Sequence, residues 1–397
     1  MDHEFRPLTA DDMDQLLDVR SVAYHPVEDR ETAAEHLTWR MPYSLGAFRG
    51  GRLRSVTFMV PFGALLGGRQ VRIGGLTGVA TAPEARRGGL VAQQLRRWFA
   101  DLREDGIGWS AEHPFEPTFY AKLGYQTVLN GHTLEMTPER LRASAGVTLA
   151  GDTGAEPVES ASPAMSATFG AYAKRFSFAL TRDDDIKDHW SFTFRRPWEH
   201  VAHFGYELED AYAVVSVEDP PVDPSRATLK VRDMAYSSPA GRRRLFAFLA
   251  AFEGQVDRVR LHLPPGDPIA LDRASYQTVH APELQVRIVD LRAALSVLPW
   301  QEDAALTIRV VDKDCPWNDG TFDVELSGAG GATVTGSRSS DPDAALDVRA
   351  LAALVTGAAT PESLLADGWA EGSVAKLRPL GRALAGHPVF KTHNDHF

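Results

Sequence analysis

The sequence of 397 residues predicts a mixed α/β and α+β chain of three consecutive domains, and three observations support this. A strand, a basic turn, a helix and a further strand follow one another between residues 70 and 111. The same order returns between residues 228 and 263, which indicates an internal duplication. After about residue 292, short strands come first and helices follow, as in an α+β layer. We therefore expect domains at residues 1–146, 147–291 and 292–397.

Composition limits the classes of function. The net charge is −11 and no basic run exceeds Arg242-Arg243-Arg244, which argues against a nucleic-acid partner. No apolar run approaches the roughly 20 residues of a membrane span, and the polar start Met1-Asp2-His3-Glu4 is unlike a secretion signal. The one cysteine, Cys315, lies in no nucleophile motif and fits a reducing compartment. We expect a cytoplasmic protein with no membrane partner.

The first domain is expected to be a mixed sheet with helices around it. Thr9-Ala10-Asp11-Asp12 should cap a helix that runs to about Ala23, and a second helix is expected from Ala33 to Trp39. Glycine pairs separate the apolar runs that follow. Strands are predicted at 46–48, 53–60, 70–81 and 107–111, with a helix ending at about Glu104 before the last of them.

The stretch from Thr77 to Phe99 has the features of a pyrophosphate cradle. Small and β-branched residues up to Thr81 indicate a buried strand, and apolar residues from Leu90 onward recur at helical spacing. Between them lies Arg86-Arg87-Gly88-Gly89, where glycine lets backbone N–H groups converge and the helix start adds partial positive charge. The stretch lacks the Lys-Ser/Thr of a P-loop and the glycine pattern of a dinucleotide site. An ordinary surface turn is the alternative.

A second stretch, Pro117-Thr118-Phe119-Tyr120-Ala121-Lys122-Leu123-Gly124-Tyr125, follows the next predicted strand. The two stretches resemble the motifs Arg/Gln-x-x-Gly-x-Gly/Ala and Tyr-x-x-x-Gly-Phe/Tyr of the GNAT superfamily of acyl-CoA N-acyltransferases. Val91 departs from the Gly or Ala of the first motif, which crowds the helix start but leaves its N–H available. The resemblance implies a GNAT fold and acetyl-CoA as co-substrate. The implied cofactor-binding residues are Val79, Ala80, Thr81, Arg86, Arg87, Gly88, Gly89, Leu90 and Val91.

The rest of the chain resembles two further modules. Residues 147–164 are rich in Gly, Ala, Ser, Glu and Pro and should be a linker or loop. In the duplicated unit the turn has one glycine, Gly241, placed before its arginines, so we expect a degenerate GNAT-like domain without cofactor. A strand is expected at 286–291. Residues 292–397 resemble a sterol-carrier-like α+β domain, with helices expected at 348–356, 361–367 and 373–384.

A GNAT domain, a GNAT-like domain and a sterol-carrier-like domain in this order resemble the Eis-type (enhanced intracellular survival) N-acetyltransferases. The match covers essentially the whole chain and includes its closing Pro388-Val389-Phe390 and Phe397. The resemblance implies transfer of acetyl from acetyl-CoA to primary amines of aminoglycoside, polyamine or lysine type, in a hexamer. It also implies Tyr120 as general acid and the α-carboxylate of Phe397 as general base.

Acetyl transfer from a thioester to an amine requires both a base and an acid. An amine at neutral pH is mostly ammonium and must lose a proton before it attacks a thioester, so a nearby carboxylate can attract the cation and accept that proton. The departing thiolate needs a proton, which a tyrosine hydroxyl can donate. Backbone N–H groups near Val79 and Thr81 would polarise the thioester carbonyl. Glu112 and Glu116 are candidates for contact with the cation, and Asp395 remains open.

Other interpretations stay open. Tyr120 could instead be a packing residue and Phe397 a frayed end. His393, Asp395 and His396 could bind a metal, but no fourth ligand follows at recognisable spacing, so we expect no metal site. The chain could also be a hydrophobic-ligand carrier that uses its third domain, or a CoA-binding regulator without turnover. Cofactor-dependent consumption of an amine separates the first function from both, and the sequence does not identify that amine.

Overall fold

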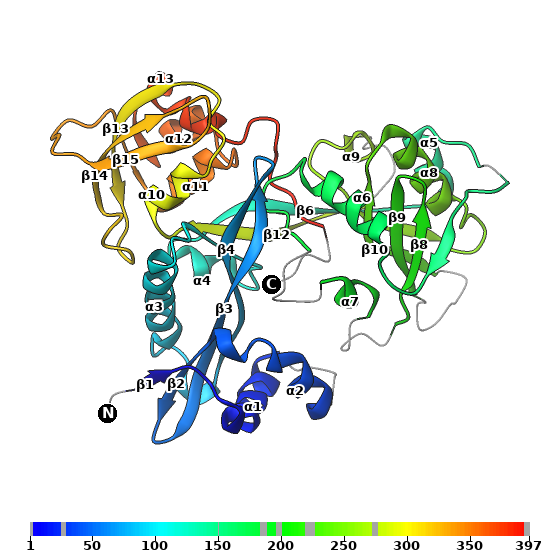
Figure 1. Cartoon of the computed structure of the whole chain (residues 1–397), viewed down its shortest axis with the longest axis horizontal. Helices are drawn as coiled ribbons and strands as arrows, with labels where there is room; N and C mark the ends of the chain where they lie inside the picture. Colours follow the sequence, from blue (N-terminus) through cyan, green and yellow to red (C-terminus); the bar gives the residue numbers. More distant parts are fainter. Residues whose placement is uncertain are drawn as a thin grey trace. The chain divides into compact units, whose positions relative to one another are not determined.

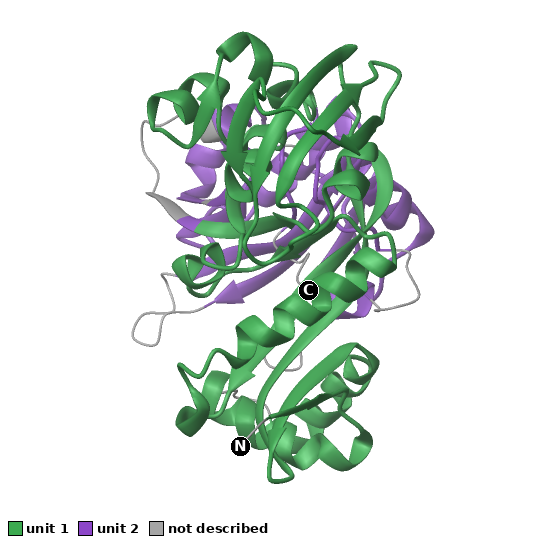
Figure 2. Ribbon diagram, turned by 90° about the vertical axis from the view of Figure 1, so that its left-hand side faces the viewer, with its two compact units in different colours: residues 1–129, 282–386, 397 green, residues 130–281, 387–396 purple. Residues whose placement is uncertain are grey.

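The computed structural model describes residues 3–24, 29–149, 151–182, 189–195, 201–218, 227–271 and 277–392. The described residues form two compact units, each made of separate stretches of the sequence (Figure 2). Unit 1 contains residues up to 129 and residues 282–386, and unit 2 contains residues 130–281 and the segment from residue 387. The three predicted domain boundaries stay predictions.

The first sheet of unit 1 has the strand order β1-β2-β3-β4-β5-β12 (Figure 1). Its strands are β1 (Glu4–Arg6), β2 (Ser44–Arg49), β3 (Arg52–Leu66), β4 (Arg69–Thr81), β5 (Trp109–Glu112) and the later half of β12 (Gln277–Ile288). β3 and β4 form a long hairpin whose two-residue turn, Gly67-Gly68, has both glycines at positive φ. β4 and β5 run parallel because a helix joins them. The predicted strands are confirmed, and β3 and β4 are longer than expected.

Helices cover both faces of this sheet. Side chains alternate along β3, so Val56 and Phe58 pack with α1 (Met13–Tyr24) and α2 (Arg30–Thr38). Met59 packs on the other face with α3 (Leu90–Glu104). The short helices here are η1 (Ala10–Asp12), η2 (Met41–Tyr43), η3 (Pro83–Ala85) and α4 (Pro117–Ala121). The three helices predicted for this region are confirmed within a few residues.

A second sheet in unit 1 has the order β15-β14-β13-β16-β17. Its elements are β13 (Ala304–Val311), β14 (Gly320–Leu326), β15 (Ala332–Gly336), β16 (Ala344–Asp347), β17 (Ala370–Gly372), α10 (Leu291–Ser296), α11 (Val348–Val355), α12 (Pro361–Ala366), α13 (Val374–Leu377) and η5 (Leu380–Arg382). The strands-then-helices order is confirmed, but β16 and β17 were not predicted. The helix expected at 373–384 is broken at Pro379, which has no N–H to donate. The strand expected to reach Leu291 ends earlier, because Asp290 caps α10 by accepting from Ala293 N at 2.9 Å.

Unit 2 has one sheet in the order β6-β11-β10-β9-β8-β7, with helices packed around it (Figure 1). Its elements are the later half of β6 (Gln126–Met136), β7 (Glu156–Val158), β8 (Phe204–Leu208), β9 (Ala211–Glu218), β10 (Thr228–Tyr236), β11 (Arg258–His262), α5 (Pro138–Ala145), α6 (Pro163–Ala173), α7 (His189–Phe194), α8 (Pro239–Ala250) and α9 (Pro268–Leu271). The linker predicted at 147–164 is wrong in part: β7 lies within it, and Ser162 caps α6 by accepting from Met165 N at 3.0 Å. None of the helices in the described ranges combines the length and apolar character that crossing a membrane requires.

Candidate functional site

The site starts where β4 and β5 separate. The two strands pair only from Gly74 opposite Ser110 to Leu76 opposite Glu112. Beyond Leu76, β4 leaves β5 and continues to Thr81 paired with β3 only. Just beyond Leu76, β4 has a bulge, since the single residue Thr57 of β3 lies opposite two residues of β4. Gly78 occupies this bulge at φ +58°, and a Cβ there would lie 2.6 Å from the Phe58 ring. The strands thus form a fork (the β4/β5 fork), and its open arm carries Val79, Ala80 and Thr81.

The basic turn lies at the end of this arm. Arg87 and Gly89 have φ values of +64° and +72°, and Gly89 is the N-cap of α3. No side chain caps α3, so the N–H groups of its first turn are available to an anion. Arg86 and Arg87 are exposed, and neither forms an ion pair with another described residue. Gly88 and Gly89 are exposed too, which lets a ligand approach the backbone closely.

Val91, the departure from the expected motif, does not obstruct this turn. Its side chain is 9% exposed and packs in the core cluster that contains Leu76, Leu95 and Tyr120. Because this side chain points into the core, its extra methyl groups fill space beneath the helix and leave the exposed turn clear.

Tyr120 lies in α4 inside a cluster of aromatic rings. It is 2% exposed, and its ring centroid is 5.0 Å from that of Phe119, 5.7 Å from Phe115 and 6.0 Å from Tyr125. The Tyr125 hydroxyl is hydrogen-bonded to Ser110 Oγ at 2.7 Å, which fixes the cluster to β5. Burial, and secondarily the nearby Glu112 carboxyl, raise the pKa of Tyr120. The phenol therefore stays protonated and can act as a proton donor.

Glu112 is a buried carboxyl at the base of the β4/β5 fork, and no described residue is its hydrogen-bond partner. It is the last residue of β5, opposite Leu76 on one side and Gln285 on the other. The residue is 1% exposed, and neither carboxyl oxygen has a hydrogen-bond partner among the described residues. Burial raises the pKa of Glu112 to about 9, so the group is neutral at pH 7 in the free protein. An unpartnered buried polar group of this kind is costly and typical of functional sites.

The Glu112 carboxyl gives a prediction for stability against pH. Its folded pKa of about 9 is raised above its usual value of 4.5, so the folded protein holds this proton more tightly than the unfolded chain. The stabilisation is therefore fully present below pH 4.5 and is lost as the pH rises to about 9. Glu112→Gln should remove this loss. Urea unfolding of both proteins at several pH values should show the variant gaining relative stability across this window, and a constant difference would contradict the assignment.

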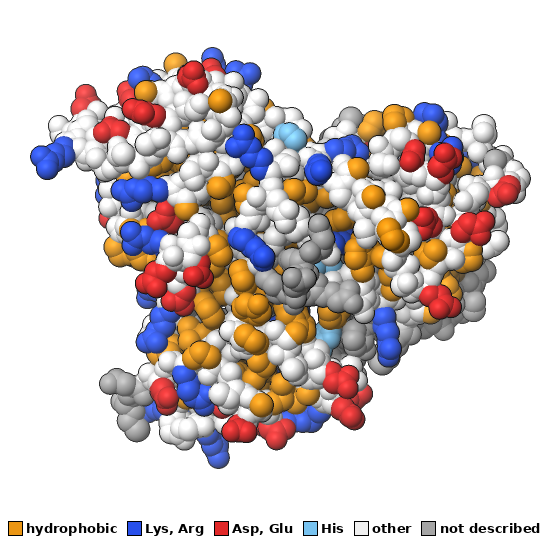
Figure 3. Space-filling model, viewed as in Figure 1, with side chains coloured by type: hydrophobic (Ala, Val, Ile, Leu, Met, Phe, Trp, Pro, Cys, Tyr) orange, Lys and Arg blue, Asp and Glu red, His pale blue; other side chains and the backbone are white. Residues whose placement is uncertain are grey.

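Tyr24 connects α1 to the open arm of the fork, a contact that the sequence analysis did not foresee. Although the residue as a whole is 46% exposed, its hydroxyl donates to Val79 O at 3.0 Å. Hydrophobic side chains gather over β3, α1 and α2 on the face of unit 1 drawn in Figure 3. An exposed apolar surface beside polar groups is typical of a ligand-binding region.

The other predicted site residues are placed differently. Glu116 is exposed and is the N-cap of α4, where it accepts from Thr118 N at 3.2 Å and from Thr118 Oγ1 at 2.6 Å. These hydrogen bonds lower the pKa of Glu116 and give it a structural role. Phe397, Asp395, His393 and His396 lie outside the described residues. Within the described ranges, no cluster of three or more histidine, cysteine or acidic side chains could hold a metal ion.

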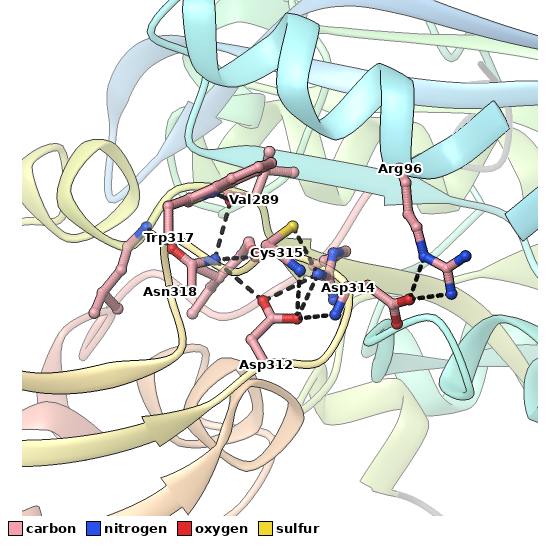
Figure 4. A network of polar contacts seen from close by, with 10 residues as sticks. Arg96, Val289, Asp312, Asp314, Cys315, Trp317 and Asn318 are labelled. Atoms are coloured by element: carbon pink, nitrogen blue, oxygen red, sulfur yellow. Dashed lines mark hydrogen bonds and ion pairs between the residues drawn. The ribbon is translucent and has the colours of Figure 1, made fainter. Parts of the chain in front are cut away.

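A buried ion pair between Arg287 and Asp312 lies next to Gly124 of the Tyr120 stretch; Figure 4 labels Asp312 and its neighbours. Gly124 has φ +84°, and a Cβ there would overlap the Arg287 guanidinium. Arg287 Nη2 donates to both Asp312 carboxylate oxygens, at 2.9 and 3.0 Å, and to Cys315 Sγ at 2.9 Å. Burial raises the pKa of Cys315 to about 12, so its thiol is protonated and not a nucleophile. This pair was not predicted from the sequence; the charged Arg287 inside the apolar run 286–289 was the available signal.

Asp314 and Trp317 of the loop after β13, and Asp290 at the start of α10, contact arginine side chains of α3. Asp314 accepts from Arg96 at 2.8 Å (Figure 4), and Asp290 accepts from Arg103 at 3.2 Å. The Trp317 indole donates to Val289 O at 2.8 Å and stacks under the Arg103 guanidinium. The helix that carries the basic turn is therefore fixed by residues of the loops before α10 and after β13.

Comparison with known proteins identifies the family. Residues 4–128 and residues 179–288 each match a family described as an acetyltransferase (GNAT) domain, and residues 291–391 match a sterol carrier protein domain. An uncharacterized N-acetyltransferase from Streptomyces coelicolor is 30% identical over 332 residues, which cover 76% of this chain and 75% of that protein. This chain belongs to the GNAT N-acetyltransferases.

The GNAT also shares its whole fold with solved structures. A GCN5-related N-acetyltransferase from Anabaena variabilis superposes with a TM-score of 0.85 at 20% identity over 100% of both chains. Eis1 from Mycobacterium abscessus superposes with a TM-score of 0.79 at 21% identity, again over 100% of both chains. The expected Eis-type fold, with tandem GNAT and GNAT-like domains before a sterol-carrier-like domain, is confirmed. GNAT domains use acetyl-CoA as co-substrate, so this GNAT is an acetyltransferase that takes acetyl-CoA and an acceptor.

Proposed function

We propose that this GNAT transfers acetyl from acetyl-CoA to a primary amine by direct attack in a ternary complex. The observation that carries this proposal is the buried, protonated Tyr120 beside the unpartnered Glu112 carboxyl at the base of the β4/β5 fork. The basic turn, with Arg86, Arg87 and the uncapped N–H groups of α3, would hold the pyrophosphate. The acyl-bearing arm of the co-substrate would then lie along Val79 to Thr81.

Tyr120 would act as the general acid. The amine nitrogen attacks the thioester carbonyl, the C–S bond breaks, and the departing thiolate takes the phenol proton of Tyr120. The acylated nitrogen releases a proton as the amide forms, and this proton restores the phenol. Its raised pKa keeps the phenol protonated over the working pH range, so the proton is still present when the thiolate forms. No covalent enzyme intermediate is needed.

The α-carboxylate of Phe397 would act as the general base that removes the ammonium proton. Glu112 would contact the cation, since a positive charge beside a neutral buried carboxyl lowers its pKa and favours an ion pair. Charge attraction at the acceptor position favours aminoglycosides, polyamines or lysine side chains over neutral acceptors. We further propose a cytoplasmic enzyme that assembles as a hexamer, as the Eis-type resemblance implies.

The proposal is tested by measuring CoA-thiol release from acetyl-CoA with aminoglycosides, polyamines and lysine peptides. Three proteins are compared: the intact chain, the chain lacking Phe397, and Phe397→Leu as the matched control, which keeps an α-carboxylate in the same place. Removal of Phe397 moves the terminal α-carboxylate back by one residue, and loss of a general base from its position lowers kcat by about 10²- to 10⁴-fold. We expect that loss on removal of Phe397 and nearly full activity in Phe397→Leu.

Each other outcome has a definite meaning. Turnover that survives removal of Phe397 would keep the enzyme but contradict its carboxylate as the base. Tight CoA binding without turnover of any amine would favour a CoA-binding regulator. Fatty-acid binding without CoA affinity would favour a carrier.

A further inference from the structure

Unit 2 contains a second strand fork that repeats the first. β10 and β11 pair in parallel only from Thr228 opposite Arg258 to Lys230 opposite Arg260. Beyond Lys230, β10 leaves β11 and stays paired with β9 only. It has a bulge at Arg232, where its register with β9 shifts. Counted from the last parallel pair, this bulge falls at the same step as Gly78 in β4. In this register Asp233 of β10 corresponds to Val79.

The second fork lacks the phosphate-binding turn. Seven residues separate Thr81 from the N-cap Gly89, whereas two separate the corresponding Ala235 from the N-cap Ser238. Ser238 caps α8 by accepting from Gly241 N at 3.0 Å, so this helix start already has a partner. A Cβ at Gly241 would clash with Asp210 O, so this glycine serves close backbone packing. The two-residue turn between Ala235 and Ser238 is too short to surround a pyrophosphate.

The carboxy-terminal segment of the chain lies in this second fork. Phe390 is 2% exposed, and its ring stacks on His262 at the end of β11, with centroids 5.2 Å apart and planes 15° apart. On its other side the ring centroid of Phe176 lies 4.8 Å away. The cavity left between Phe390, Thr392 and β10 is about 10 Å³, room for one water at most. The fork is filled by peptide.

The segment is held as an extended peptide. Ser177 N donates to Pro388 O at 2.9 Å, and Phe390 N donates to Ser177 O at 3.1 Å, as in a parallel bridge. Ser177 Oγ also donates to His387 O at 2.9 Å. Three hydrogen bonds from one residue fix the position of the segment along the fork.

Arg182 connects the end of the segment to β10. Its guanidinium donates to Asp233 at 2.6 and 3.1 Å and to Thr392 Oγ1 at 2.8 Å. The Tyr212 hydroxyl donates to the same carboxylate at 2.8 Å. Arg182 also lies 3.8 Å from the centroid of the Phe169 ring. Asp233, which corresponds to Val79 of the first fork, thus binds the Arg182 guanidinium, and Arg182 in turn binds Thr392 of the carboxy-terminal segment.

We propose that the second GNAT-like domain is a receptor for this chain's own residues 387–392, which take the place that acetyl-CoA takes in the first domain. Arg182 is the positioning residue of this receptor, because it holds Thr392 at the end of the described segment. The catalytic consequence rests on the proposed function, in which Phe397 supplies the base.

The test uses the full chain with Thr392→Val, which removes the hydroxyl acceptor, and Thr392→Ser, which keeps it. Arg242→Met is the matched control, since it breaks an ion pair of unit 2, to Asp267 at 2.9 Å, that involves no residue of the segment. Mass spectrometry follows amide exchange in peptides that contain Ser177 and Phe390. Loss of one hydrogen bond to a charged group corresponds to roughly tenfold or more in an equilibrium constant.

We expect about tenfold faster exchange at Phe390 in Thr392→Val, a similar loss of kcat and an unchanged KM for acetyl-CoA. Thr392→Ser and Arg242→Met should behave as the parent protein, and calorimetry should find one acetyl-CoA per chain. Unchanged exchange in Thr392→Val, or a second acetyl-CoA site per chain, would overturn the receptor assignment. Faster exchange with unchanged kcat would overturn the positioning role. If the parent shows no turnover, the proposed function fails, while the exchange and stoichiometry measurements still decide the receptor.

Discussion

Tyr120→Phe is expected to lower kcat by about 10²- to 10⁴-fold, the usual contribution of a general acid. The substitution removes one oxygen from a ring held by three aromatic neighbours, so the packing of the cluster should persist. The dissociation constant of acetyl-CoA should not change, because the basic turn lies on other elements. Steady-state kinetics with the aminoglycoside, polyamine or lysine peptide that is acetylated fastest give kcat. Calorimetric titration with acetyl-CoA gives the dissociation constant.

The matched control is Tyr43→Phe, which removes the same atom from the short helix η2, outside the Tyr120 cluster. The pH dependence adds a second readout. Because burial raises the pKa of Tyr120, the parent enzyme should show no loss of kcat from its ionisation in the mildly alkaline range. Retained kcat in Tyr120→Phe would leave this residue with a packing role only.

Gly124→Ala is expected to lower the free energy of unfolding by about 3–5 kcal/mol, the range for breaking a buried ion pair. The new Cβ would displace the Arg287 guanidinium, whose pair with Asp312 is fully buried, with exposed side-chain fractions of 0% and 1%. Asp312 also accepts from Cys315 N and from Asn318 Nδ2, so the disturbance would reach the whole loop. Denaturant unfolding followed by tryptophan fluorescence gives the value.

Gly106→Ala separates the two causes of this loss. Gly106 also has a positive φ, +72°, but a Cβ there meets nothing within 4 Å. This control should therefore cost only the backbone strain, about 1–2 kcal/mol. Equal losses in the two variants would show that the Arg287 pair contributes nothing beyond the strain at Gly124.

Local patterns predicted the parts of the fold that depend on neighbours in sequence. The run up to Thr81, the glycine-containing basic turn and the amphipathic helix from Leu90 are adjacent, so their periodicity places the basic turn without knowledge of the rest. The duplication could be recognised because the strand, basic turn and helix of residues 228–263 are also adjacent in the sequence. Tyr120 could be selected because its motif includes Gly124 and Tyr125.

Long-range partners explain what the sequence analysis missed. Arg287 lies far along the chain from Gly124, and no local pattern shows that the glycine makes room for it. The short strands β7, β16 and β17 have three or four residues each, too few to establish an alternation. Tyr24 ends a helix whose sequence gives no hint that its hydroxyl reaches Val79.

The interleaved composition of the two units has a consequence for how the protein is made. Unit 2 begins at residue 130, yet Ser177 finds its bridge partner, Val389, only after residues 282–386 of unit 1 have been made. Unit 1 likewise needs residues 282–386, which leave the ribosome after all of the unit 2 sheet. Neither unit can therefore close while the nascent chain is still short, although domains commonly fold in turn from the amino terminus. Contacts this distant in sequence slow folding, so both units should complete their folding only after residues 387–392 have been made.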